Sequence, residues 1–461
     1  MRRLVVAAIL VLLAGVAAAV AWGLAERDRE YRQLIAAGDS ALVAGQTGPA
    51  VEAFSGALAL KPDSMLAYLR RGEAYRRVGD LDAALRDLRQ ATALDPGAPR
   101  PLEQMGDVLR ARGRFDRAAE RYAAYVALDD RSPRVLYKLA LSRYQNNQPA
   151  AAVAPLRRAL ALDDQVPEAS YLLGLCFESE NRLKDAIRAY ERAARLAPAM
   201  TEVREALTRA YRAAGRRDDS IEELEALSAL EPARPERRLA LARAYADADR
   251  PEQAIATLGR AVSRFPDSVE TYATLGEIWL RVADQTDDGV ALGKALEALR
   301  TAVVRGGSTS RDLAMYAKAQ TRSGDATGAL RSAREASGKL PVDPETLRLL
   351  ATLASGQGEL REARDALVRY AALIAGAPVP PDVPRQIAQW SIDLRDPATA
   401  ATWLTRAIDP AHPDPALLGQ LAEAQLATGR TDDARATLER ALPLAPQDPR
   451  LLRLKARLSR P

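Results

Sequence analysis

Few residues in this 461-residue chain have the type and spacing that catalysis requires. The one histidine, His412, stands alone in a proline-flanked loop at 409–415. The segment Gly289 to Lys294 is superficially similar to a phosphate-binding loop. However, Asp288 stands where the first glycine belongs, and Ala295 stands where Ser or Thr belongs. Because no HExxH, CxxC or GxSxG motif occurs either, the sequence predicts that the protein is not an enzyme.

The sequence also lacks the residue patterns that metal or cofactor binding requires. The single cysteine, Cys176, can neither form an intramolecular disulfide nor supply a thiolate metal site alone, so we expect a small core residue there. Asp284, Asp287 and Asp288 form a short acidic group that lacks the spacing of a calcium loop. The sequence therefore predicts no cofactor, no metal and no small-molecule substrate.

The overall charge points away from nucleic acid as a partner. The chain has 66 basic and 61 acidic residues, which leaves a net charge of only +5. No cluster of basic residues with interleaved aromatic residues stands out. We therefore expect other proteins, through peptide or helical segments, to be the partners.

The strongest pattern in the chain is one small residue that recurs at a spacing of 34. A fixed period of about 20–50 residues is typical of repeat architectures. Ala dominates the series, and Ser220 is its one other residue. After two small insertions the series continues to the C-terminal region. Its members are Ala50, Ala84, Ala118, Ala152, Ala186, Ser220, Ala254, Ala295, Ala329, Ala363, Ala400 and Ala434.

Turn residues accompany the same repeat. Five residues before most of these alanines stands Gly, Asn or Asp, the types that tolerate a left-handed backbone at a helix end. Twelve residues after many of them stands a proline, which ends a second helix. A small residue twelve positions upstream, such as Gly72 or Gly106, lets two helices approach closely. Each unit is therefore predicted to be a helix, a tight turn, a second helix and a break.

These positions identify a family resemblance. Residues 65–98 carry the landmarks in register: Tyr68, Gly72, Tyr75, Gly79, Ala84, Ala91 and Pro96. The unit resembles the tetratricopeptide repeat, a helix-turn-helix of the same length. The resemblance implies an all-α, right-handed superhelical α-solenoid of about twelve units. We expect units 1–8 over 31–309 with an insertion at 283–293, units 9–12 over 310–448 with a proline-rich insertion at 377–381, and a capping helix at 449–461.

The resemblance also predicts where a partner would bind. In this family the first helix of each unit lines a concave groove that holds a partner's peptide or helix. At the groove positions this chain is first acidic, then aromatic and aliphatic, then basic. The predicted binding residues are Asp39, Glu73, Asp107, Tyr137, Leu141, Tyr144, Tyr171, Leu175, Arg209 and Arg243. The alternative is that the tyrosines only pack between neighbouring helices and the charges form a solvated face.

The N-terminal segment 1–25 is predicted to be a signal anchor, followed by a linker at 26–30. Arg2 and Arg3 precede an uncharged apolar run that extends to Ala25, long enough for a membrane span. A cleaved signal peptide, with small residues at 17–19 as its cleavage site, is the alternative. The anchor is favoured because the apolar run continues past that site. The repeats are then expected on the periplasmic side of a bacterial inner membrane.

A scaffold for cell-envelope assembly, tethered by the N-terminal helix, is the leading functional hypothesis. Two alternatives remain open at this stage. One is a cytoplasm-facing, membrane-tethered regulatory adaptor. The other is a non-catalytic subunit of an enzyme complex such as a glycosyltransferase.

Overall fold

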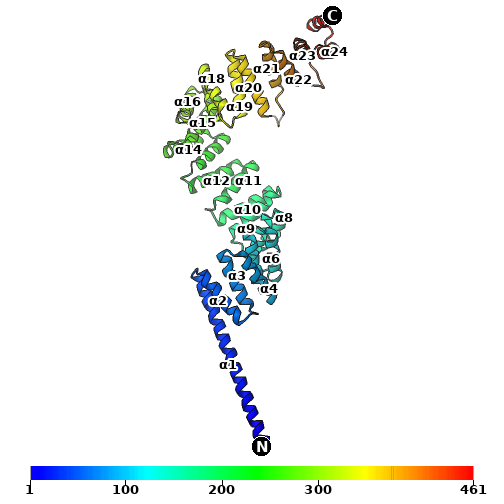
Figure 1. The fold of residues 1–461 in the computed structure, drawn as a ribbon. Helices are drawn as coiled ribbons and strands as arrows, with labels where there is room; N and C mark the ends of the chain where they lie inside the picture. The colour runs from blue at the N-terminus through cyan, green and yellow to red at the C-terminus, as the bar shows by residue number, and fades with distance from the viewer. Residues whose placement is uncertain (1, 375, 377, 460–461) are drawn as a thin grey trace. The chain divides into compact units, whose positions relative to one another are not determined.

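The computed structural model describes residues 2–374, 376 and 378–459, without the side chains of residues 2–11. The regular elements in this part of the chain are all α-helices, so the predicted all-α repeat architecture is confirmed. The chain forms two compact units, Met1–Leu230 and Glu231–Pro461, and each is described by itself (Figure 1).

The first unit consists of successive helices of similar length after a much longer first one. Their bounds are α1 Arg2–Val43, α2 Thr47–Leu60, α3 Met65–Val78, α4 Leu81–Leu94, α5 Pro99–Ala111, α6 Phe115–Leu128, α7 Pro133–Gln145, α8 Pro149–Leu162, α9 Pro167–Ser179, α10 Leu183–Leu196, α11 Thr201–Ala213 and α12 Arg217–Leu230.

The second unit continues the same pattern. Its helices are α13 Pro235–Asp247, α14 Pro251–Arg264, α15 Val269–Thr286, α16 Gly289–Arg305, α17 Ser310–Arg322, α18 Ala326–Gly338, α19 Pro344–Gly356, α20 Leu360–Leu373, α21 Asp382–Asp393, α22 Pro397–Ala407, α23 Pro415–Ala427, α24 Thr431–Ala441 and α25 Pro449–Leu458.

Within each unit, every helix packs on the helix before it, and first helices of neighbouring repeats also touch. Such first-helix contacts join α3 to α5 and α7 to α9 in the first unit, and α13 to α15 and α17 to α19 in the second. Side chains on successive first helices can therefore form one continuous surface.

The recurring small residue lies where the helices of a pair meet. All its alanines are fully buried, and Ser220 is 2% exposed. The turns also form as predicted, with positive φ at Gly79 (91°), Gly113 (69°) and Asn147 (57°), among others. Arg395 has the same conformation, with φ of 57°, although nothing in its residue type predicts it. The repeat thus imposes a left-handed turn even on a residue that disfavours it.

The predicted insertion at 283–293 is accommodated within the helices of its repeat. It lengthens both helices of its repeat, so that α15 has 18 residues and α16 has 17. Two residues connect the helices: Asp287, which has a left-handed backbone with φ of 52°, and Asp288. Ala283 is fully buried within α15. The proline-rich insertion at 377–381 includes Ala377, which lies outside the described residues.

The helix α1 runs without interruption through the predicted linker at 26–30. From Arg27 onward it is tied to the first repeat, because Arg27 donates a hydrogen bond to the Leu60 carbonyl at 3.0 Å. No described helix is both long and apolar enough to cross a membrane. This finding gives the predicted anchor at 1–25 no support, and residues 1–11 of that segment lie outside the described side chains.

At the other end of the chain, α25 covers the last repeat. Its Leu451 and Leu454 are buried and join the hydrophobic core of the second unit. An end helix with one apolar face closes a repeat array that would otherwise expose its core.

Candidate functional site

Five predicted binding residues lie together on the first helices α7 and α9. We call them the central surface: Tyr137, Leu141, Tyr144, Tyr171 and Leu175. Each is half-buried, because one side of the side chain packs on the repeat core and the other remains open. These residues therefore support the repeat core and also leave apolar surface exposed to solvent.

Burial disfavours the ionised form of two tyrosines of the central surface, Tyr137 and Tyr171. Burial raises the pKa of Tyr137 and of Tyr171, and at Tyr171 the guanidinium of Arg209 partly opposes that effect. Tyr171 also packs on Tyr190 with ring centroids 5.8 Å apart. The Tyr190 hydroxyl donates a hydrogen bond to Glu178 at 2.6 Å. The ring of Tyr171 is thus held in position by contacts within the protein.

A pocket of about 310 Å³ adjoins Tyr137. It lies where α7, the end of α8 and the start of α9 meet, and it is lined by Pro133, Arg134, Tyr137, Ala159, Asp163, Val166, Glu168 and Ala169. Of these residues, sequence reasoning found only Tyr137. The others come from three separate segments, and no spacing rule in the sequence connects them. The pocket has room for an apolar side chain, with charged groups at its edge.

The predicted acidic residues are already engaged by basic residues of the protein. Asp39 pairs with Arg70 at 3.1 Å, and Glu73 pairs with Arg77 at 2.9 Å. Because these carboxylates are neutralised locally, they have less charge to offer a partner than the sequence pattern suggests.

Asp107 belongs to a larger polar network between α5 and α7. It pairs with Lys138 at 2.7 Å and accepts a hydrogen bond from the Tyr122 hydroxyl at 2.6 Å. Lys138 also contacts Glu103 at 2.8 Å, and Arg134 contacts the same carboxylate at 2.9 Å. Glu103 was missed in the sequence, because the repeat pattern does not show which acids are enclosed by two basic side chains.

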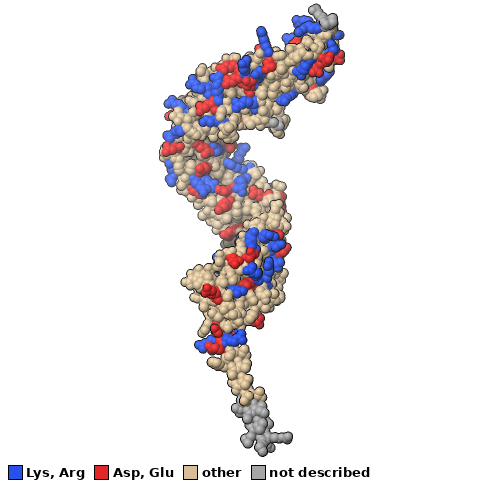
Figure 2. Space-filling model, in the orientation of Figure 1, with Lys and Arg blue, Asp and Glu red and all other residues tan. Residues whose placement is uncertain are grey.

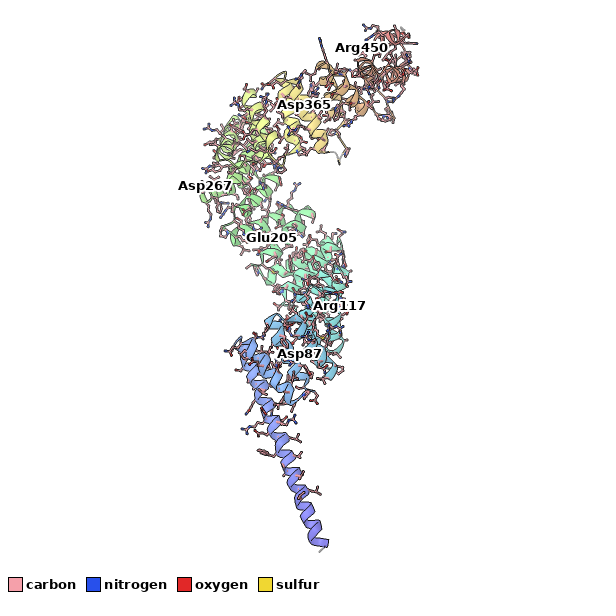
Figure 3. The ribbon with its side chains drawn as sticks, in the orientation of Figure 1. Asp87, Arg117, Glu205, Asp267, Asp365 and Arg450 are labelled. Carbon is pink, nitrogen blue, oxygen red and sulfur yellow. The ribbon has the colours of Figure 1, made fainter. Side chains whose placement is uncertain are left out.

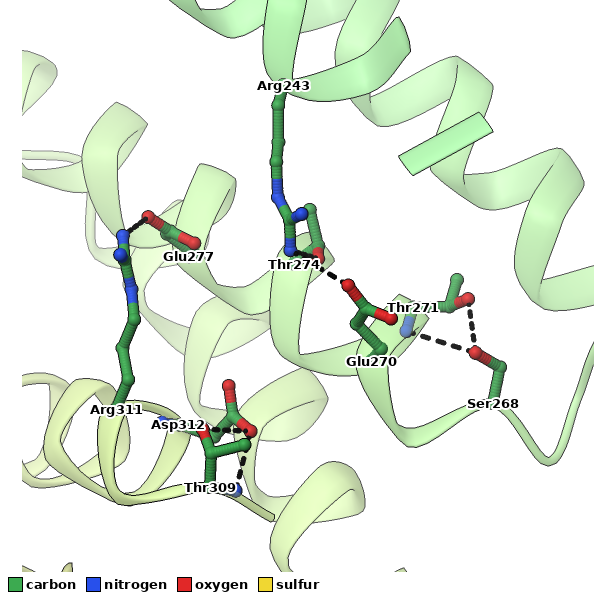
Figure 4. A network of polar contacts seen from close by, with 9 residues as sticks. All are labelled: Arg243, Ser268, Glu270, Thr271, Thr274, Glu277, Thr309, Arg311 and Asp312. Carbon is green, nitrogen blue, oxygen red and sulfur yellow. Dashed lines mark hydrogen bonds and ion pairs between the residues drawn. The ribbon is translucent and has the colours of Figure 1, made fainter. Parts of the chain in front are cut away.

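The two predicted basic residues differ in their surroundings. Arg209, on α11 of the first unit, is exposed and forms no ion pair among the described residues. Arg243, on α13 of the second unit, contacts Glu270 at 3.3 Å and Thr274 at 3.0 Å (Figure 4). Arg209 is therefore the more available cation for a partner.

Figure 4 shows a second link of the same kind between repeats. Arg311 of α17 donates to Glu277 of α15 at 2.8 Å. Nearby, Thr309 and Asp312 form a reciprocal capping box at the start of α17. Such polar contacts between first helices hold the register of neighbouring repeats, and both signs of charge are interspersed on the visible face (Figure 2).

The residues considered for catalysis or metal binding have ordinary structural surroundings. His412 is exposed and lies 3.4 Å from Asp409. Asp284 and Asp287 both pair with Arg322, at 2.7 and 2.9 Å. The described residues contain no group of three or more His, Cys, Asp or Glu side chains placed to hold a metal ion.

The segment at Gly289–Lys294 is the first part of α16 and therefore not a loop. Asp288 caps that helix by accepting a hydrogen bond from the Val290 amide at 2.8 Å. Cys176 is fully buried, as expected for a core residue, and burial raises the pKa of its thiol to about 12. Such a thiol is a poor nucleophile at neutral pH.

Comparison with known proteins agrees with the geometry of the repeats. Two family models, each described as tetratricopeptide repeat, match this chain. One matches residues 35–99, 104–167 and 137–201, and the other matches 211–277 and 391–458. A comparison with curated proteins gives no match.

Several solved structures are similar to parts of the chain. A crystal structure of MamA is 28% identical, with a TM-score of 0.34, and covers 35% of this chain and 95% of its own. YrrB, titled a TPR protein with an unusual peptide-binding site, is 21% identical with a TM-score of 0.37, covering 40% of this chain and 94% of its own. PilF of Pseudomonas aeruginosa is 22% identical with a TM-score of 0.39, covering 45% and 95%.

These structural similarities are too low to bear on function. The family matches, in contrast, together span more than half of the sequence and lie within the array of helix pairs described above. The chain therefore belongs to the tetratricopeptide-repeat family.

Proposed function

We propose that this protein is a non-catalytic scaffold that holds a peptide or helix of a partner protein on the central surface. The observation that carries the proposal is the continuity of five half-buried aromatic and aliphatic side chains across α7 and α9, next to an open pocket. Proteins of this family bind other proteins or peptides. Aromatic residues that are fixed by their neighbours are the usual anchors of such interfaces.

The chemistry of the surface suggests the partner segment. An apolar side chain would enter the pocket beside Tyr137, whose edge carries Asp163 and Glu168. A basic residue adjacent to that anchor would meet these carboxylates. An acidic residue farther along the segment would reach the unpaired Arg209. Complementary charges of this kind set the direction and register of a bound segment.

The proposal includes a role in the cell envelope. Between Leu12 and Leu24, α1 exposes apolar side chains around its circumference, including Trp22 at 73%. Apolar side chains without a protein partner favour burial in another apolar medium. We place this segment, with the residues before it, in the bacterial inner membrane and the repeats in the periplasm. Secretion to the periplasm after cleavage is the alternative location.

The binding proposal is tested with peptides selected from a random display library on the wild-type protein. The dissociation constant of a selected peptide is then measured by fluorescence anisotropy. In the double variant Tyr137→Glu with Tyr171→Glu, we expect that constant to rise at least about thirtyfold, because the loss of even one anchor residue that contributes roughly 2 kcal/mol has this effect. Helicity by circular dichroism should remain that of the wild type.

Leu128→Glu provides the matched control. Leu128 lies on the second helix α6 and is already 49% exposed, so an acid there adds charge without touching the central surface. Its peptide affinity should equal that of the wild type. If the double variant folds and binds every selected peptide with unchanged affinity, the central surface is not the binding site.

Location is tested separately by thiol labelling of intact cells. Single cysteines replace the exposed Lys184 and Arg300 in a Cys176→Ala background. Labelling by a membrane-impermeant reagent without lysis is the expected result. Labelling only after the inner membrane is broken would place the repeats in the cytoplasm and support the adaptor function.

A further inference from the structure

Two arginines occupy a position that most first helices fill with an apolar residue. They are Arg204 on α11 and Arg238 on α13, which are 34 residues apart, whereas the same position holds buried leucines such as Leu102 and Leu136. A guanidinium beside a repeat core needs a counter-charge, because an unpaired charge near apolar surroundings is costly.

Arg204 has the counter-charge that it needs. Its guanidinium donates to the Glu223 carboxylate at 2.7 Å and to the Pro198 carbonyl at 2.7 Å. Both charged side chains are largely enclosed, at 17% and 15% exposure. The first of the two arginines is therefore satisfied within its own repeat.

Arg238 has the equivalent carbonyl contact but not the equivalent carboxylate contact. It donates to the carbonyl of Pro232 at 2.8 Å, the equivalent of Pro198. The residue 34 positions after Glu223, however, is Thr257. Arg238 forms no ion pair with a carboxylate in the described part of the chain. The exchange of Glu for Thr thus removes the counter-charge while the arginine remains.

The surroundings of Arg238 add positive charge. Arg260 and Arg264 on α14 stand where the preceding repeat has Ala226 and Leu230. Arg238 and Arg264 both lie over the ring of Phe265, at 5.7 and 6.0 Å from its centroid. Burial lowers the pKa of Arg238, and the nearby Arg264 and Arg260 lower it further.

Carboxylates on the neighbouring loops are already occupied. Glu231 pairs with Arg234 at 3.3 Å and with Arg237 at 2.5 Å. Asp267, labelled in Figure 3, pairs with Arg305 at 2.9 Å. Arg238, with Arg264 and Arg260 nearby, therefore forms a positive site that has no ion-paired acid among the described residues.

We propose that Arg238, Arg260 and Arg264 bind an acidic segment, rich in Glu or Asp, of a partner protein. The partner's carboxylate would take the place that Glu223 takes beside Arg204. We choose a carboxylate because Arg204, the equivalent arginine of the preceding repeat, has the same type of carbonyl contact and pairs with the carboxylate of Glu223. The site shares no residue with the central surface, so it extends the proposed function and does not depend on it.

The test uses the full chain and a fluorescent peptide of alternating Glu and Gly. Thr257→Glu should restore the internal ion pair and occupy the site. Arg238→Met should remove the guanidinium and restore the apolar type that other repeats have. Each variant is expected to lower the affinity for the peptide about tenfold or more, because a charge-assisted hydrogen bond is lost. The loss should shrink at high ionic strength.

Arg331→Ala is the matched control, because Arg331 on α18 is exposed and has no ion pair among the described residues. It should change the affinity less than about twofold. Failure of the wild type to bind the peptide, or equal binding by the wild type and both variants, would overturn the proposal. Binding of a phosphoserine peptide in the absence of Glu-peptide binding would overturn the carboxylate assignment. If Thr257→Glu fails to fold, Arg238→Met alone decides.

Discussion

Replacing Gly106 by Ala tests how closely the two helices of a repeat approach each other. Gly106 lies on α5 opposite the buried ring of Tyr122 on α6. A Cβ atom at Gly106 would lie 2.5, 2.7 and 2.8 Å from three carbons of that ring. The ring cannot move away easily, because its hydroxyl is held by Asp107 at 2.6 Å. The added methyl group therefore overpacks the repeat.

Two opposing contributions set the magnitude. In a helix interior Ala is more favourable than Gly by about 1 kcal/mol. Overpacking of a well-packed core costs roughly 1–3 kcal/mol. Since the contacts here are far inside van der Waals distance, we expect the overpacking cost to dominate, with a net loss of about 1–2 kcal/mol.

The next repeat suggests a background in which the Gly106→Ala substitution should stabilise the protein. There Ala140 faces Leu156, and both are fully buried. In a Tyr122→Leu background, which copies this pair, the Gly106→Ala substitution should no longer clash. It should then stabilise the protein by about 0.5–1 kcal/mol through helix propensity alone. The double-mutant cycle separates this coupling from the loss of the Tyr122 hydrogen bond.

The four proteins of the cycle are compared by urea denaturation with circular dichroism. Because repeat arrays can open locally, hydrogen exchange of the amides in α5 and α6 is measured as well. A Gly106→Ala effect of the same sign and size in both backgrounds would refute the argument. It would mean that the approach of α5 to α6 adapts freely to an added methyl group.

Two further predictions concern buried polar chemistry. The Cys176 thiol, with its pKa raised to about 12, should resist labelling at pH 7–9 until the protein is unfolded. The stability linked to this raised pKa is fully present below pH 9 and is lost as the pH rises toward 12. Rapid labelling of the folded protein would contradict the prediction. Asp87→Asn should lower the free energy of unfolding by about 3 kcal/mol, because the buried Asp87 carboxylate accepts hydrogen bonds from Arg71 at 2.7 and 2.9 Å. As a control, Asp82→Asn on the surface should lower it by less than about 1 kcal/mol. Asp87 is labelled in Figure 3, and equal effects of the two substitutions in urea denaturation would contradict the second prediction.

Much of the repeat geometry follows from the sequence because each unit is local. The alanine spacing predicts the buried contact between paired helices, and Gly, Asn or Asp before it predicts the left-handed turn. Arg395 shows where this reasoning fails, since the turn there forms without a permissive residue. The spacing also does not show how the insertion at 283–293 is accommodated, which is by extension of the two helices of that repeat.

The candidate site was only partly predictable. Register within the repeat correctly brought Tyr137, Leu141 and Tyr171 to neighbouring first helices. It could not show that Asp107 is neutralised by Lys138 of the next repeat. Nor could it show that Glu223 pairs with Arg204 on the neighbouring helix, which is the contact that gives the exchange to Thr257 its meaning for Arg238.

The sequence by itself determined the repeat, its period, its turns and the residue types on each helix. These features depend on contacts within about 34 residues, which a periodic pattern records directly. Tertiary structure alone decided which charges are paired, which side chains line the pocket and which arginines have no counter-ion. Those properties depend on distances between side chains of different helices. The strength of an ion pair changes when the two charges move by a few ångströms, and residue spacing in the sequence does not specify such distances.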